Sequence, residues 1–178
     1  MKKIINVIDR ISGCGGWTAG GMMVVALAIG ISEIVARYVF GKTLYIADEY
    51  SGYLMAMLTF IGLSYTLRER GHIRMMFLVH FLKGRSRTIF NMVCMLVGLV
   101  FCVGLVWFTG EFFWDSVVNR TQSMQITETY LAIPQVFLPI GSFFLLLQFL
   151  AEFLKGVAVL RQDTTGLRIL EETDELGR

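Results

Sequence analysis

Long apolar stretches alternate with short charged ones along the chain. Four stretches carry no Asp, Glu, Lys or Arg: residues 11–32, 50–67, 88–110 and 129–151. Each reaches the roughly 18–20 residues that a helix needs to cross the hydrocarbon core of a bilayer. Because the backbone in lipid has to satisfy its own hydrogen bonds, such stretches form helices. The pattern predicts an all-α membrane protein with four transmembrane helices, over residues 11–36, 48–67, 88–110 and 129–152.

Two shorter segments have an amphipathic pattern. In residues 2–11, Ile4, Ile5, Ile8 and Ile11 fall on one helical face and the charged residues fall elsewhere. Residues 72–83 also gather their apolar side chains on one face. Amphipathic helices of this kind lie in the membrane interface, so we expect one at each place. The acidic tail, residues 163–178, is expected to be flexible, which leaves one four-helix membrane domain over residues 1–178.

The cations predict the orientation. With four crossings, 13 of the 16 Lys and Arg residues fall on one side, in the N-terminal segment, the second connection and the tail. The other side holds only Arg37, Lys42 and Arg120. The positive-inside rule then puts both termini in the cytoplasm. The net charge of +2 is explained by this topology and gives no reason to expect a nucleic-acid partner.

The composition and motifs exclude several classes of function. The chain is 55% hydrophobic, which points to a membrane protein. It has no Gly-rich phosphate loop, HExxH or GxSxG, and its two histidines, His72 and His80, are too far apart to be metal ligands on one short helix. No enzymatic activity, metal or cofactor in this chain is therefore expected. With almost nothing polar in mid-span, the pattern favours an interaction role in a larger complex.

A few polar residues near the ends of the spans are candidates for function. Glu33 and Arg37 share a helical face at i and i+4, as a self-neutralising pair or as a functional intramembrane site. Asp48 and Glu49 begin the second span, where carboxylates favour the helix dipole. Pro134 and Pro139 lie in the first third of the last span and are expected to bend its entry.

Several of these residues also form a familiar pattern. The segment from Arg37-Tyr38 through Asp48-Glu49 and Gly62 to Arg68 and Gly71-His72-Ile73 resembles the small four-helix subunit of tripartite ATP-independent periplasmic (TRAP) transporters, the DctQ-like family. Ile133-Pro134 and Pro139-Ile140-Gly141 match the opening of that family's last helix. The chain departs from the family at Tyr45-Ile46, Arg74-Met75-Met76 and Gln135. The likeness extends over residues 31–149.

The resemblance implies a place and partners. The protein would lie in a bacterial inner membrane beside a large membrane subunit that carries the substrate and sodium sites. A periplasmic solute-binding protein would deliver an organic acid, a carboxylate or a sulfonate. The small subunit would extend the fixed scaffold without binding the solute. Candidate contacts with subunits, lipid or binding protein are Glu33, Arg37, Asp48, Glu49, Arg68, Arg70, His72, Arg74, Trp114, Arg120 and Pro134.

Two further roles remain open from the residues alone. Membrane lipids are expected partners, with lipid phosphates opposite Arg68, Arg70 and Arg74, so a bound phospholipid is a possible component. A small stand-alone four-helix exporter would use a carboxylate in its first span, and Glu33 keeps that alternative open.

Overall fold

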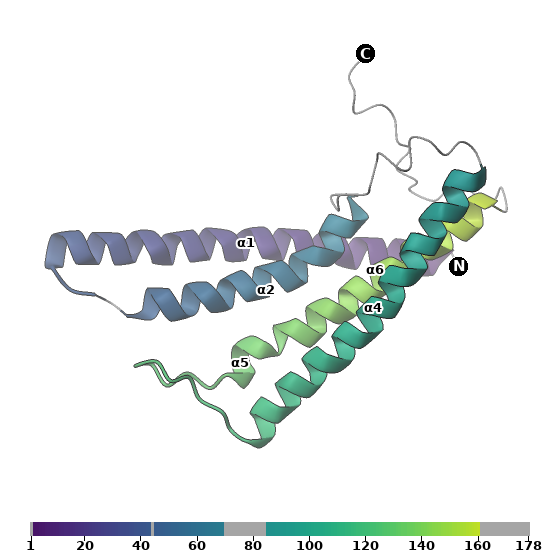
Figure 1. The fold of residues 1–178 in the computed structure, drawn as a ribbon. Coiled ribbons are helices and arrows are strands. Elements are labelled where there is room, and N and C mark those ends of the chain that lie inside the picture. Colours follow the sequence, from purple (N-terminus) through teal and green to yellow (C-terminus); the bar gives the residue numbers. More distant parts are fainter. Residues whose placement is uncertain (1, 44, 70–84, 161–178) are drawn as a thin grey trace, which may run out of the picture.

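The computed structural model describes residues 2–43, 45–69 and 85–160, which are predominantly helical (Figure 1). The helices are α1 (Lys2–Phe40), α2 (Ile46–Arg68), α4 (Arg85–Val118), α5 (Ala132–Gln135) and α6 (Phe137–Leu160). Outside the helices, the described residues include one isolated antiparallel bridge, between Gln122 and Tyr130. The expected all-α fold class is confirmed.

Three stretches of the described residues are long and apolar enough to cross a membrane: Ile5–Phe40, Ile89–Val118 and Ala132–Ala158. They cover the first, third and fourth of the expected spans. The second expected span is present as α2, a helix of 23 residues, but it is not among these three. Ser, Thr, Tyr and Gly residues lower its mean hydropathy.

Helix α1 corrects one expectation. Residues 2–11 do not form a separate interfacial helix, because α1 runs without a break from Lys2 to Phe40. Ile5 and Ile8 are buried, as an apolar face predicts, but Asp9 and Ser12 are buried too. No proline separates the two expected helices, and tertiary contacts hold the first turns in line with the rest of α1. The interfacial helix expected over residues 72–83 and the tail from residue 163 lie outside the described residues.

Helix α4 extends further than its apolar run. The expected span ends at residue 110, before the charge of Glu111, whereas the helix continues to Val118. Glu111 and Trp114 are therefore helical residues, and the connection to α5 begins only after Val118. Glutamate is a good helix former, so a charge that ends an apolar run does not have to end a helix.

The last span is divided near its start, where its two prolines predict a bend. Helix α5 ends at Gln135 and α6 begins at Phe137, with Pro134 in the first and Pro139 in the second. Pro139 has no N–H to donate to the carbonyl of Gln135, and its ring crowds that carbonyl. The expected distortion of the helix entry is therefore present.

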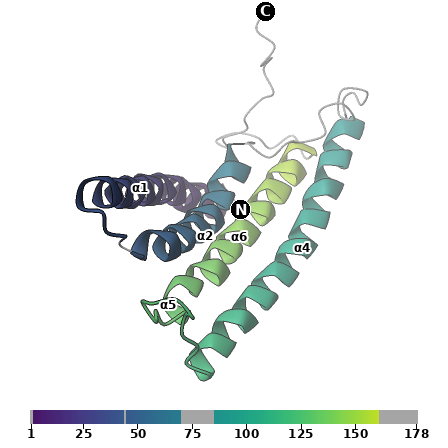
Figure 2. The ribbon, with the colours of Figure 1, turned by 60° about the vertical axis from the view of Figure 1, so that its left-hand side comes forward.

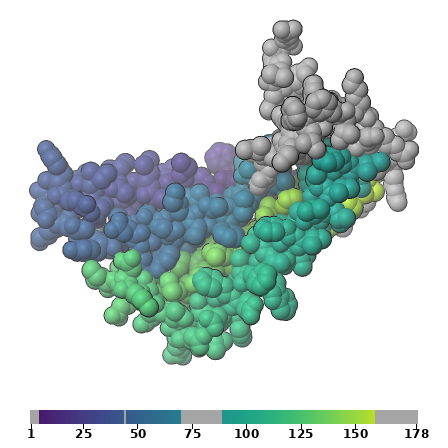
Figure 3. Space-filling view, in the orientation of Figure 1, coloured from purple at the N-terminus to yellow at the C-terminus, as the bar shows by residue number. Residues whose placement is uncertain are grey.

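The helices stand in a row in the order α1, α2, α6, α4 (Figures 1 and 2). Neighbours in the row pack extensively, α1 also touches α6, and α1 and α4 make no substantial contact. Helices α1 and α4 therefore form opposite edges of the molecule (Figure 3). The small core of Leu67, Cys102 and Leu145 lies where α2, α4 and α6 meet.

Glycines permit the close approaches between neighbouring helices. A Cβ atom at Gly141 of α6 would lie 2.5 Å from the backbone carbonyl of Phe60 in α2. One at Gly16 of α1 would lie 2.5 Å from the ring of Tyr65 in α2. Small residues let helices approach in lipid, where no hydrophobic effect drives them together.

Candidate functional site

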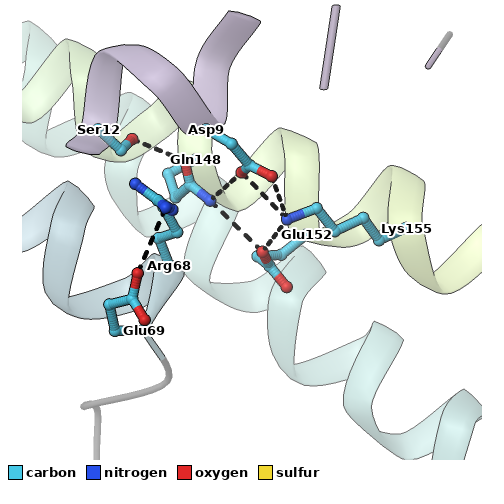
Figure 4. A network of polar contacts seen from close by, with 7 residues as sticks. All are labelled: Asp9, Ser12, Arg68, Glu69, Gln148, Glu152 and Lys155. Atoms are coloured by element: carbon cyan, nitrogen blue, oxygen red, sulfur yellow. Dashed lines mark hydrogen bonds and ion pairs between the residues drawn. The ribbon is translucent and has the colours of Figure 1, made fainter. Parts of the chain in front are cut away.

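Five polar residues of α1 and α6 meet where α1 begins and α6 ends. We call them the Asp9 cluster: Asp9, Ser12, Gln148, Glu152 and Lys155 (Figure 4). Asp9 and Ser12 are spaced i and i+3 on α1. Gln148, Glu152 and Lys155 fall on one face of α6, so each set points toward the other helix.

An ammonium group held by two carboxylates lies at the centre of this cluster. Lys155 Nζ is 2.9 Å from Asp9 Oδ2 and 2.8 Å from Glu152 Oε1. The side chains of all three residues are 10% exposed or less. Buried charges are tolerated only when they are paired and hydrogen-bonded, and this geometry meets both conditions.

Gln148 connects the charged groups to Ser12. Its amide nitrogen donates to Asp9 Oδ1 over 3.1 Å and to Glu152 Oε1 over 3.4 Å. Its amide oxygen accepts a hydrogen bond of 2.7 Å from the Ser12 hydroxyl. Gln148 is fully buried, so both ends of its amide are satisfied within the protein. The cluster thereby joins the first turns of α1 to the last turns of α6.

Arg68 ends α2 beside this cluster (Figure 4). Its guanidinium is 3.5 Å from Glu69 and lies over the ring of Tyr65, 5.9 Å from the ring centroid. A Cβ at Gly13 of α1 would lie 2.5 Å from Arg68 Nη1, so the glycine makes room for the guanidinium. Only 16% of the Arg68 side chain is exposed, and it packs within the protein.

A second polar group lies at the opposite ends of the helices, where α2 begins and α4 ends. We call it the Glu49 cluster: Glu49, Tyr50, Tyr53, Thr127 and Thr129. Tyr53 donates a hydrogen bond of 2.6 Å to one oxygen of Glu49, and the Thr127 hydroxyl donates to the other. The carboxylate is buried and held by hydroxyl groups. It therefore fastens the connection after α4 to the first turn of α2.

The backbone at this end adopts left-handed conformations at three residues other than glycine. Tyr45 has φ 56°, Arg120 has φ 48° and Glu128 has φ 45°. All three lie in the connections after α1 and α4. Such conformations persist where surrounding contacts fix them, and they gather at functional loops.

Glu33 and Arg37 form the ion pair that their spacing predicts. Arg37 Nη2 donates to Glu33 Oε1 over 3.0 Å. The Glu33 side chain is 10% exposed and that of Arg37 is 62% exposed, so the arginine reaches outward from a buried carboxylate. This geometry agrees with the self-neutralising pair considered from the sequence.

The other candidate residues do not gather in one place. Asp48 is exposed on the first turn of α2, and Arg120 is exposed after α4. Trp114 is 65% exposed on α4, and Pro134 is buried in α5. Arg70, His72 and Arg74 lie outside the described residues.

Sequence reasoning missed the Asp9 cluster and the part of Thr127 in holding Glu49. Asp9 and Lys155 are 146 residues apart, so no local spacing reveals their contact. A signal was available within the last span, where Gln148 is followed by Glu152 and Lys155 on the same face. A buried amide one turn before an ion pair indicates an interhelical polar contact. Among the described residues, no group of three or more His, Cys, Asp and Glu could hold a metal ion.

Comparison with known proteins gives one family. A family model described as "Tripartite ATP-independent periplasmic transporters, DctQ component" matches residues 23–159. This stretch includes α2, α4 and α5, the last 18 of the 39 residues of α1, and nearly all of α6. No curated protein matches the chain.

Proposed function

Because the chain belongs to the DctQ family of tripartite ATP-independent periplasmic transporters, we propose that it is the scaffold subunit against which the large membrane subunit works. The family is the small permease component of these transporters, and three helices apolar enough to cross a membrane agree with a multi-pass membrane protein. Through the large subunit, the complex would take up an organic acid, a carboxylate or a sulfonate.

The open row of helices is the observation that carries this proposal. In the most apolar 18-residue window, only 6% of the α1 span and 11% of the α4 span is buried. A helix that is apolar on most sides is covered by lipid or by other protein. The row offers long apolar edges and faces to a larger membrane protein, which suits a scaffold.

The positions of the charged groups also support a scaffold. Buried charged residues in the described part of the chain are Asp9, Glu33, Glu49 and Lys155, and they lie toward the ends of the helices. A solute or ion pathway is marked by ionisable groups within the span. The Asp9 cluster instead fixes the helices where α1 begins and α6 ends, and the Glu49 cluster fixes them where α2 begins and α4 ends. The shape presented to a partner is therefore rigid.

The proposal includes the rest of the transporter. The large subunit would hold the substrate and sodium sites, and uptake would be driven by sodium across a bacterial inner membrane. A periplasmic binding protein would deliver the solute. The connection after α4 would face it, with Arg120 exposed and Glu49 fastening the loop to α2.

Helix α2 would be the fourth span, with both termini in the cytoplasm. Its 23 residues make about 34 Å, enough for the hydrocarbon core. It packs along α1, and the Glu49 cluster holds its first turn beside the connection that follows α4. In this arrangement, a membrane that α1 crosses would be crossed again by α2.

Purification from native membranes tests the proposal. The tagged chain would be solubilised in mild detergent and recovered, and its partners would be identified and quantified by mass spectrometry. Recovery of one large polytopic membrane protein in equal amount is the expected result. Recovery of the chain alone, or only with copies of itself, would contradict a scaffold subunit.

A further inference from the structure

A shallow apolar groove runs along α4 beside α6. It has a volume of about 490 Å³ and is lined by Val103, Val106, Trp107, Gly110, Glu111, Trp114 and Leu146. Val103, Val106 and Leu146 supply aliphatic surface. Gly110 leaves open space, since a Cβ placed there would meet nothing within 4 Å.

The groove contains one charged side chain. Glu111 is exposed, and it makes no hydrogen bond or ion pair with any residue in the described ranges. Trp107 and Trp114 lie four residues before it and three residues after it, which places all three on one face of α4. The two indoles are 72% and 65% exposed.

These three residues lie toward the end of the span. Glu111 is seven residues before Val118, where α4 ends, which is about 10 Å along the helix. Tryptophan gathers at the level of the lipid headgroups. An unneutralised carboxylate between two exposed indoles suits an ammonium group, which is attracted by the charge and by the aromatic faces.

The size of the groove selects the kind of occupant. A helix of a partner subunit is about 10–12 Å across with its side chains and would lie over the groove without entering it. An acyl chain is one methylene wide and can lie along Val103, Val106 and Leu146. An anionic headgroup would be repelled by Glu111, whereas an amine headgroup would not.

We propose that this groove binds a phospholipid with an amine headgroup, its ammonium at Glu111 between Trp107 and Trp114 and one acyl chain along α4 and α6. Gly110 keeps the groove open, and Glu111 selects the headgroup. This site is independent of the proposed transport role, because it requires only a membrane around α4.

Quenching of tryptophan fluorescence by brominated lipid tests this site. The full chain carrying Trp17→Phe keeps only Trp107 and Trp114, and Trp17 is 87% exposed, so its loss leaves the packing intact. The protein would be reconstituted with brominated phosphatidylethanolamine or brominated phosphatidylglycerol of the same acyl chains. We expect the amine lipid to be preferred by about fivefold, the size of one exposed cation–π contact with an ion pair.

Two variants separate the groove from its charge. Gly110→Leu fills the groove and is expected to remove the preferred binding, whereas Gly104→Leu on the same helix should keep it, because Gly104 also has open space but does not line the groove. Glu111→Gln is expected to equalise the two lipids, whereas Glu128→Gln, an exposed glutamate outside the groove, should not.

Three outcomes would overturn the proposal. Equal quenching by both lipids in the parent protein would show that the groove does not select an amine. A preference unchanged in both Gly110→Leu and Glu111→Gln would place the binding elsewhere. A third variant, Glu111→Lys, addresses a protein partner. If the parent protein is quenched equally by both lipids and Glu111→Lys loses a subunit that copurifies with the parent protein, the groove binds that subunit instead.

Discussion

Lys155 holds its ammonium group between Asp9 and Glu152 with 10% of its side chain exposed. Lys155→Met would leave two carboxylates buried at the same place without a cation. We expect it to lower the free energy of unfolding by about 3–5 kcal/mol, because removing one partner leaves an uncompensated buried charge. Thermal or denaturant unfolding of the purified protein in detergent measures the change.

A surface lysine provides the control for this variant. Lys42→Met, at an exposed position, should change the free energy of unfolding by less than about 0.5 kcal/mol. Adding Asp9→Asn to Lys155→Met should restore part of the lost stability, since one of the unpaired charges is then gone. A loss in Lys155→Met no larger than in Lys42→Met would mean that the cluster contributes no net stability.

Glu33 distinguishes the scaffold from the exporter. Its carboxylate is 3.0 Å from Arg37, and Glu33→Gln keeps a hydrogen-bond acceptor of the same shape at that place. We expect uptake by the assembled transporter to keep most of its rate in this variant. Solute flux into cells, normalised to the amount of subunit in the membrane, measures the effect. Complete loss of transport with normal assembly would favour the exporter instead.

Residue-level predictions from the sequence succeed where a contact is local. The Glu33–Arg37 pair follows from i and i+4 spacing on one helix. The contact between Lys155 and Asp9 depends on how α1 lies against α6, which no spacing along the chain encodes. Asp9 also lies next to Ile8 in an amphipathic pattern, and that pattern predicts a solvated charge where the structure buries one.

Among the helices, α2 and α6 cross so closely at Gly141 that a single added atom would meet the backbone of α2. Gly141→Ala would place a methyl group 2.5 Å from the backbone carbonyl of Phe60, which cannot move aside as a side chain can. We expect a loss of about 1–3 kcal/mol in stability, from overpacking. The unfolding midpoint in detergent should fall in Gly141→Ala and stay nearly constant in Gly104→Ala, where space is open. Equal midpoints would contradict this account of the crossing.

The sequence predicts that a helix is present better than it predicts where the helix begins and ends. The apolar runs predict α1, α4 and α6, and the two prolines predict the interruption before α6. Charges mark where a run stops being apolar, so they misplace the end of α4 by eight residues, from residue 110 to Val118. The amphipathic pattern likewise separates residues 2–11 from α1 wrongly. It shows which face of a helix is apolar, but it does not show whether the helix bends.

For the whole molecule, the position of α2 in the membrane decides the topology. Lys42 follows α1 and Met124 follows α4, so they lie on the same side of the membrane only if α2 crosses it. We expect Lys42→Cys and Met124→Cys, in a background without the three native cysteines, to react alike with a membrane-impermeant thiol reagent on spheroplasts. Both should label from outside. Labelling from opposite sides would show that α2 does not cross.

The order of helices in the row has a consequence for the life of the chain before it assembles. The edges at α1 and α4 are apolar along most of their length, and no described helix folds back to cover both. A subunit made without its partner exposes these edges to membrane proteases and to aggregation. The half-life of the orphan chain in pulse-chase experiments should therefore lengthen when the partner gene is co-expressed. Production levels of the two genes would then be matched by degradation of the excess.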